Sequence, residues 1–198
     1  MAKRLFDLIG AALALLLLAP LLAGVAVAIR LDSPGPVFFR QERVGFGGVP
    51  FRIHKFRTMR VNSQALGPQV TVGLDARITR VGHWLRHYRI DELPQLLDVL
   101  LGRMSLVGPR PEVPRYVAHY PAALKARVLG VRPGITDPAS LANLDESALL
   151  AAASDPEREY IDHVLPRKLA LQAEYAANAT LWSDLLVLVR TLRTLLLR

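Results

Sequence analysis

The sequence predicts a mainly helical α+β protein, made of an N-terminal membrane helix and a small domain of helices with a short β-hairpin. Three observations lead to this fold class. A long apolar run lies near the N-terminus, short aromatic and β-branched segments flank a glycine-rich connection, and helical patterns alternate with proline-rich loops. We expect amphipathic helices of the domain to lie at the membrane interface.

The apolar run covers residues 8–29 and is interrupted only by Pro20. About 20 apolar residues span the hydrocarbon core of a bilayer. Basic residues lie on both sides, Lys3-Arg4 before the run and Arg30 after it, so the positive-inside rule does not orient a spanning helix. Pro20 removes a backbone hydrogen bond and favours a bend. We therefore expect residues 1–32 to form a re-entrant anchor broken at Pro20, with a straight spanning helix as the alternative.

Two other interpretations of the run are open. A basic start, an apolar stretch and the small residues Ala26 and Ala28 are typical of a secretory signal peptide, although the run exceeds the usual apolar core of about 7–15 residues. The other interpretation is a buried helix of a soluble protein, but a chain of 198 residues seldom hides so long a segment on all sides.

The segment after the anchor predicts a turn and then a hairpin. Pro34-Gly35-Pro36 forms the turn, because neither a helix nor a strand crosses it. Residues 37–39 and 51–56 are predicted strands, and the glycines between residues 45 and 48 provide the connection. Residues 62–75 are polar, without a clear period, and predict a loop.

Helices are predicted over residues 78–88 and 91–101. Asp91 is placed at the N-cap of the second helix, with Pro94 in the first turn, where proline is tolerated. Gly102 is expected to end this helix.

The C-terminal half is predicted to be helical, with stiff proline-containing loops. Its predicted helices cover residues 116–128, 154–178 and 181–198, and its stiff loops cover residues 109–114 and 132–138. The last helix is amphipathic, and Trp182 suits headgroup depth, so the helix is interpreted as interfacial. Packing against the core is an equal alternative.

Length and charge limit the class of protein. A chain of 198 residues supports one domain, here residues 33–198, plus the anchor. The absence of cysteine excludes disulfides and thiolate metal sites. A net charge of +8 indicates an anionic partner, for which anionic membrane lipid and a phosphorylated substrate fit best. No motif or basic block typical of nucleic-acid binding is present, so we expect no nucleic acid.

The acidic pair Asp91-Glu92 is the candidate for chemistry. The partial positive charge of a helix N-terminus keeps a carboxylate ionised, and an ionised aspartate can act as a nucleophile. Glu92 could hold Mg²⁺, which favours one or two carboxylates together with substrate phosphates. The alternative is a simple helix cap with solvated arginines around it. The cations near the pair in sequence, or expected near it, include Lys55, Arg57, Arg80, Arg86, Arg89, Arg110 and Arg132.

A series of motifs gives a family resemblance that runs nearly from end to end. The matching segments are residues 3–7, 33–45, 55–59, 77–86, 91–96, 104–112 and 132–136. On these motifs the chain resembles the small monotopic phosphoglycosyl transferases, bacterial sugar transferases that begin glycan assembly on a polyprenol carrier.

The resemblance implies an enzyme at the cytoplasmic face of the bacterial inner membrane. It implies transfer of a phosphosugar from a UDP-sugar to undecaprenyl phosphate, giving UMP and undecaprenyl-diphosphate sugar. In this chemistry Asp91 forms a covalent phosphosugar intermediate, and Glu92 helps to hold Mg²⁺. The substrate-binding residues that the resemblance implies are Lys55, Arg57, Arg86, Arg110, Pro111 and Arg132.

Two departures from the family pattern limit what it implies. Residues 137–141, Asp-Pro-Ala-Ser-Leu, stand where Gly-Trp-Ala-Gln is widespread, which leaves the sugar open. Alanine precedes Pro20, where a serine hydroxyl would satisfy a freed carbonyl. A non-catalytic membrane adaptor of glycan-assembly enzymes is the alternative function, and the intact Asp91-Glu92 pair argues against it. The leucine-rich tail is compatible with a homodimer but does not require one.

Overall fold

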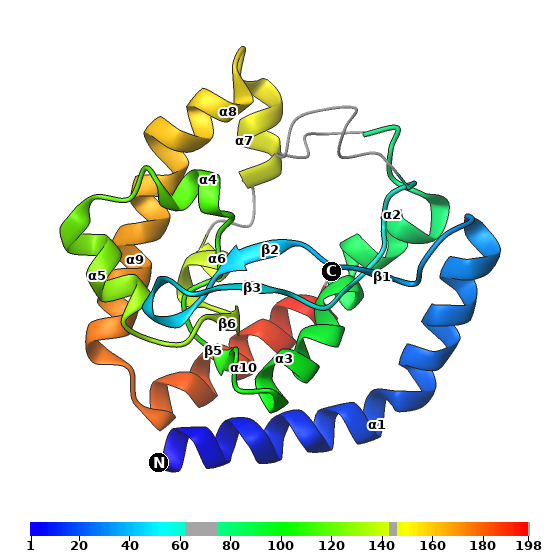
Figure 1. Cartoon of the computed structure of the whole chain (residues 1–198), viewed down its shortest axis with the longest axis horizontal. Coiled ribbons are helices and arrows are strands. Elements are labelled where there is room, and N and C mark those ends of the chain that lie inside the picture. The colour runs from blue at the N-terminus through cyan, green and yellow to red at the C-terminus, as the bar shows by residue number, and fades with distance from the viewer. Residues whose placement is uncertain (62–74, 143–145, 198) are drawn as a thin grey trace.

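The computed structural model describes residues 1–61, 75–142 and 146–197, so most of the loop predicted over 62–75 lies outside the described residues. Figure 1 shows a helical domain that lies inside the bend of one long N-terminal helix. Three small two-stranded sheets link the helices of the described residues, which confirms a mainly helical α+β fold.

Helix α1 (Ala2–Asp32) is continuous and contains Pro20. It runs along the bottom of Figure 1 and then turns upward on the right. Sharp bends in helices are almost always caused by proline, so we attribute the turn to Pro20. By length and composition α1 could cross a membrane, and only 11% of its most apolar stretch is buried. The helix therefore indicates a membrane-bound protein; which topology it takes stays a prediction.

Polar contacts join the start of α1 to the domain. The buried carboxylate of Asp7 accepts hydrogen bonds from Ser105 Oγ (2.9 Å) and from the backbone N–H of Leu106 (3.1 Å). Lys3 Nζ lies 2.6 Å from Oδ2 of Asp184, a fully buried carboxylate of the C-terminal helix. The basic start that the sequence analysis treated as a membrane flank is thus bound by the protein itself.

The end of α1 is joined to the same domain. Asp32 Oδ2 accepts from the backbone N–H of Val81 (3.0 Å), and Arg57 donates to the carbonyl oxygens of Ser33 (2.8 Å) and Pro34 (2.6 Å). Both ends of the apolar helix are therefore fixed to one polar domain.

The predicted hairpin is present, with different strand limits. Strand β2 (Glu42–Val44) pairs antiparallel with β3 (Pro50–Arg52) around a short 3-10 turn, η1 (Phe46–Gly48). Further from the turn, β1 (Phe38–Phe39) pairs with β4 (Lys55–Phe56). Strand β2 was not predicted from the sequence.

The helix predicted over 91–101 begins differently. The structure has α2 (Arg80–His87), then a 3-10 turn, η3 (Ile90–Gln95), and then α3 (Leu96–Leu100). The N-cap assigned to Asp91 is wrong, because Arg89 occupies that position with a left-handed φ of 58°. Gly102, with φ of 79°, follows α3 as predicted.

A parallel strand pair lies inside segments that the sequence analysis treated largely as loops. Strand β5 (Ser105–Val107) pairs with β6 (Gly134–Thr136). The chains approach so closely that a Cβ on Gly134 would lie 2.0 Å from the nitrogen of Gly108. A side chain at Gly134 would therefore separate the two strands.

The remaining helices confirm the helical C-terminal half. The predicted helix 116–128 is divided before Pro121, and the helix predicted from residue 154 contains one π-helical turn. The elements are α4 (Pro114–Val117), α5 (Ala122–Leu129), α6 (Pro138–Ala142), α7 (Glu146–Ala152), α8 (Pro156–Glu159), η4 (Tyr160–Val164), α9 (Leu165–Asn178) and α10 (Leu181–Leu196).

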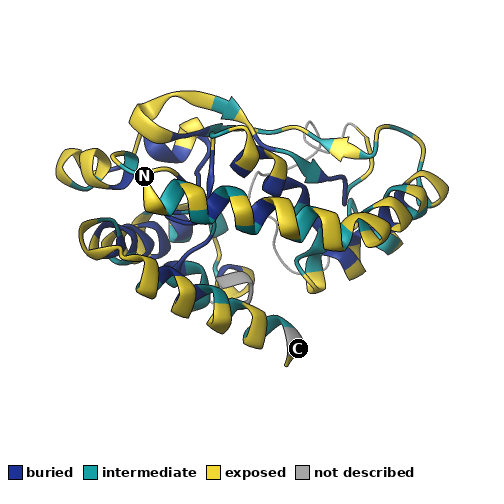
Figure 2. Ribbon diagram, turned by 90° about the horizontal axis from the view of Figure 1, so that it is seen from below, coloured by how far each residue is buried: buried dark blue, intermediate teal, exposed yellow. Residues whose placement is uncertain are grey.

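Helix α10 packs against the domain, as one of the two interpretations of the C-terminal segment expected, and its interfacial role stays a prediction. Asp184 and Val187 are buried against the domain, and Thr191 Oγ1 lies 2.8 Å from Thr136 Oγ1 of β6. The opposite side exposes large apolar residues, among them Trp182 and Val189. Figure 2 shows exposed residues along α10, the helix that ends at C, and along α1.

We expect Asp7→Ala to loosen α1 from the domain. The substitution leaves the buried N–H of Leu106 without its acceptor and removes one of the two acceptors of the Ser105 hydroxyl, which costs about 1–3 kcal/mol. Thermal unfolding in detergent should show a lower Tm. The matched control is Asp162→Ala, which removes an exposed pair with Arg158 worth about 0–1 kcal/mol. Equal Tm values for the two variants would contradict the assignment.

Candidate active site

Asp91 and Glu92 form a buried acidic pair in η3. They are 2% and 6% exposed, respectively. Lys55, from β4, places Nζ 2.9 Å from Asp91 Oδ2 and 3.4 Å from Glu92 Oε1. A buried carboxylate is stable only when it is paired or hydrogen-bonded, and one lysine here serves both. The structure thus places Lys55 beside the dyad, and its role in substrate binding stays a prediction.

Arg110 binds Glu92 through both ends of its guanidinium fork. Nη1 donates to Oε2 (3.0 Å), Nη2 donates to Oε1, and Arg89 Nη1 lies 3.6 Å from Oε2. Burial by itself raises the pKa of Glu92, but the charges of Arg110 and Lys55 outweigh it and hold this pKa well below its ordinary value. The pKa of Arg110 is raised in turn, chiefly by the charge of Glu92.

Asp91 differs from Glu92 in having one free oxygen. Its Oδ1 is buried and has no hydrogen-bond partner within the part of the chain that the structure describes. Such an oxygen suits a ligand that brings a positive or electrophilic centre. The described residues hold no cluster of three or more possible metal-ligating side chains. Mg²⁺ needs only one or two carboxylates when phosphates supply other ligands, so this pair fits it.

Arg86, from α2, is coupled to the same pair. Its Nε donates to Thr58 Oγ1 (2.9 Å), which orients the side chain. Burial lowers the pKa of Arg86, and the charge of Asp91 is the largest influence that opposes the shift. Arg86 therefore belongs to the electrostatic surroundings of the dyad.

Another buried carboxylate fixes the residue directly before Lys55. Asp98 is fully buried in α3, and its Oδ2 accepts from the backbone N–H of His54 (2.7 Å). Its Oδ1 lies 2.9 Å from Nδ1 of the same histidine. Since α3 continues directly from η3, this contact holds Lys55 in register with the acidic pair. Asp98 was not predicted as a site residue, because its only signal in the sequence is its place in the helix predicted after the acidic pair.

Two predicted substrate-binding arginines make other contacts. Arg57 donates to the carbonyls that follow α1, which joins it to the anchor. Arg132 is exposed, donates from Nε to the carbonyl of Gly102 (3.0 Å) and lies over the ring of Phe46 at 6.0 Å. Neither residue contacts the dyad, and their predicted role in substrate binding stays a prediction.

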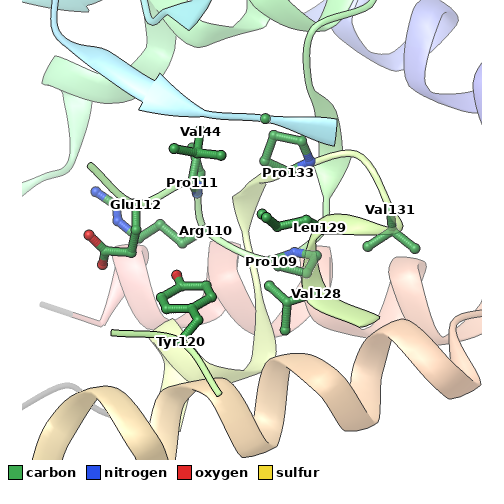
Figure 3. Close-up of a pocket in the computed structure, with 11 residues that line it drawn as sticks. Val44, Pro109, Arg110, Pro111, Glu112, Tyr120, Val128, Leu129, Val131 and Pro133 are labelled. Carbon is green, nitrogen blue, oxygen red and sulfur yellow. The ribbon is translucent and has the colours of Figure 1, made fainter. Parts of the chain in front are cut away.

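Arg110 also lines a small pocket, which Figure 3 shows. Its free volume is about 10 Å³, room for about one water molecule. Pro111 lines it, and Glu112 points toward a charged cluster that the sequence analysis missed. Tyr160 Oη donates to Glu112 Oε1 at 2.5 Å, and Lys168 and Arg43 each lie 3.7 Å from the carboxylate. Burial raises the pKa of Glu112, but these two cations lower it overall.

Comparisons with known proteins agree on one family. A family model described as bacterial sugar transferase matches residues 1–198. A UDP-N-acetylgalactosamine-undecaprenyl-phosphate N-acetylgalactosaminephosphotransferase of Aeromonas hydrophila is 42% identical over 98% of this chain and 43% of the relative. A UDP-glucose:undecaprenyl-phosphate glucose-1-phosphate transferase of Caulobacter vibrioides is 42% identical over 98% of this chain and 69% of the relative.

A third relative extends the range of lengths. The undecaprenyl-phosphate glucose phosphotransferase of Komagataeibacter xylinus is 40% identical over 96% of this chain and 35% of the relative. The chain thus spans 35% to 69% of the length of these three proteins, which are all named as transferases to undecaprenyl phosphate.

We expect Glu92→Gln to change how stability depends on pH. The pKa of Glu92 is lower in the folded protein than its ordinary 4.5. Its contribution is therefore present above about pH 4.5 and is lost as pH falls toward the folded pKa. Removing one partner of a buried pair costs about 3–5 kcal/mol. Tm measured against pH should show a gap between wild type and variant that is widest near pH 7 and narrows below pH 4.5; a constant gap would contradict this.

Proposed function

Because this chain belongs to the bacterial sugar transferase family, we propose that it transfers a phosphosugar from a UDP-sugar to undecaprenyl phosphate, with release of UMP. The acidic dyad carries the proposal. One carboxylate is compensated by Arg110 and Lys55, and its neighbour keeps one oxygen free. Adjacent carboxylates in such different surroundings suit two different roles.

We assign the nucleophile to Asp91. Its Oδ1 attacks the phosphorus that bears the sugar, the bond from that phosphorus to the bridging oxygen of the diphosphate breaks, and UMP leaves with the electron pair. Lys55 Nζ lies 2.9 Å from Oδ2, which leaves Oδ1 free for the attack. Arg86 and Lys55 are the cations near Asp91 that oppose the negative charge of the transferring group.

The second step restores the aspartate. A phosphate oxygen of undecaprenyl phosphate attacks the same phosphorus, the bond between that phosphorus and Asp91 breaks, and undecaprenyl-diphosphate sugar leaves. Two displacements divide one difficult transfer into two easier ones.

Mg²⁺ is the proposed cofactor. Glu92, together with phosphate oxygens of the substrate, would hold it. When bound, the ion neutralises charge on the diphosphate oxygens. Arg110 keeps Glu92 ionised and in place for this purpose.

We propose that α1 enters the cytoplasmic leaflet of the bacterial inner membrane and returns. Its start is tied to the domain through Asp7, and its end through Asp32. A helix that spans the bilayer would place its ends on opposite sides, which two attachments to one polar domain oppose. The exposed apolar sides of α1 and α10 would then contact the lipid, which also holds the isoprenoid acceptor.

We expect single cysteines at Ala2 and at Glu42 to label from the same side of the membrane. Both positions are exposed, and the chain has no cysteine of its own, so each label reports one site. The measurement is labelling by a membrane-impermeant maleimide in sealed right-side-out and inverted vesicles. Labelling of the two sites from opposite faces would establish a spanning helix instead.

We expect Asp91→Asn to abolish transfer without unfolding the protein. The amide has no anionic oxygen to attack phosphorus, so UMP release should fall by at least about a thousandfold. The measurement uses detergent-solubilised protein, Mg²⁺, a panel of UDP-sugars and undecaprenyl phosphate.

The control for this variant is Asp162→Asn, because Asp162 is an exposed acidic residue of η4. It should retain wild-type turnover, and both variants should fold. Substantial UMP release by Asp91→Asn would overturn the nucleophile assignment. A folded wild type that releases no UMP with any donor would instead favour a membrane adaptor.

A further inference from the structure

Asp137 is a buried carboxylate for which the proposed chemistry has no use. It lies between β6 and α6 and is 0% exposed. Its Oδ2 accepts from the backbone N–H of Arg110 (3.0 Å) and from Nε2 of Gln172 (2.7 Å), and its Oδ1 accepts from the N–H of Ser140 (2.6 Å). All three partners are N–H donors, so a carboxylate, which only accepts, satisfies them together.

The hydrogen bond from the Arg110 N–H to Asp137 adds one contact beyond the backbone hydrogen bonds that join strands β5 and β6. The N–H of Gly108 donates to the carbonyl of Thr136 at 3.1 Å. The backbone ladder does not continue in the same way, because Pro109 and Pro138 have no N–H. The side chain of Asp137 takes the N–H of Arg110 in place of a main-chain acceptor.

Arg110 is therefore held at both ends. Its guanidinium binds Glu92, and its backbone nitrogen binds Asp137. The pKa of Arg110 is raised first by Glu92, against the effect of burial, and further by Asp137, so both carboxylates stabilise the same charge. A shift of the Arg110 backbone would move the fork relative to Glu92, and misplacement by about 1 Å can cost about 100-fold in rate.

We propose that Asp137 is a positioning residue that sets the place of Arg110, and through Arg110 that of Glu92, for the transfer proposed above. The inference rests on that proposed function. It gives a role to the first residue of segment 137–141, where the sequence departs from the family pattern.

The test compares three variants. Asp137→Ala removes the acceptor for Arg110. Asp137→Asn can keep it, because an amide turned with its oxygen toward Arg110 and Gln172 loses only the bond to Ser140. Thr136→Val is the matched control, since it removes the hydroxyl contact with Thr191 one residue away and leaves Arg110 untouched.

Two measurements are made on each full-length variant in detergent. Steady-state kinetics separates kcat from KM for the donor. Hydrogen exchange of the peptide that contains Arg110 reports the link itself, because its neighbours Pro109 and Pro111 carry no amide hydrogen.

We expect Asp137→Ala to lower kcat by roughly 10- to 100-fold with little change in KM, and to speed exchange at Arg110. Asp137→Asn should recover most of the rate, and Thr136→Val should match wild type in both measurements. Should Asp137→Ala not fold, Asp137→Glu takes its place: it keeps the charge but moves the carboxylate, so kcat should again fall about tenfold.

Wild-type kcat in Asp137→Glu, or equal kcat in Asp137→Ala and Thr136→Val, would overturn the positioning role. Unchanged exchange at Arg110 in Asp137→Ala would overturn it as well. These outcomes leave the proposed function intact. A wild type without any transfer activity would overturn the proposed function, and this role with it.

Discussion

The pairing of a buried glutamate with a buried arginine is the interaction on which the rest of this structure depends. An unpaired carboxylate as buried as Glu92 would be protonated or would unfold the site. Arg110 prevents this, and its own backbone N–H is bound by Asp137. Strands β5 and β6 are only three residues long. The segments that follow them bring Asp137 and Arg110 together.

The same constraint explains why two neighbouring acidic residues differ. Asp91 and Glu92 follow one another in a 3-10 turn, so their side chains leave the backbone in different directions. Glu92 points to the cations that compensate it, whereas Asp91 pairs with Lys55 through one oxygen and keeps the other free among the described residues. Local backbone geometry therefore separates a carboxylate fixed by charge from one available for reaction.

The anchor is part of the folded domain. Asp7 and Asp32 bind backbone N–H groups of the domain at opposite ends of α1, and Val25 and Ile29 of α1 are buried. Arg57 binds the segment directly after α1, and Lys55, two residues before it, binds the dyad. The short segment from Lys55 to Arg57 therefore connects the anchor with the site. This connection would keep the site at a fixed distance from the membrane surface into which the anchor inserts.

The sequence by itself determined the apolar helix, the hairpin connection, the helical C-terminal half and the acidic pair. These features depend on local patterns: hydropathy over a window, glycine and proline at turns, and motifs read in order. Tertiary structure alone decided that Lys3 binds Asp184, that Asp7 binds Ser105 and that Asp137 holds Arg110. Partners 181, 98 and 27 residues apart leave no period in the sequence. Strands of three residues are likewise too short to show alternation, so β5 and β6 become visible only when their backbones meet.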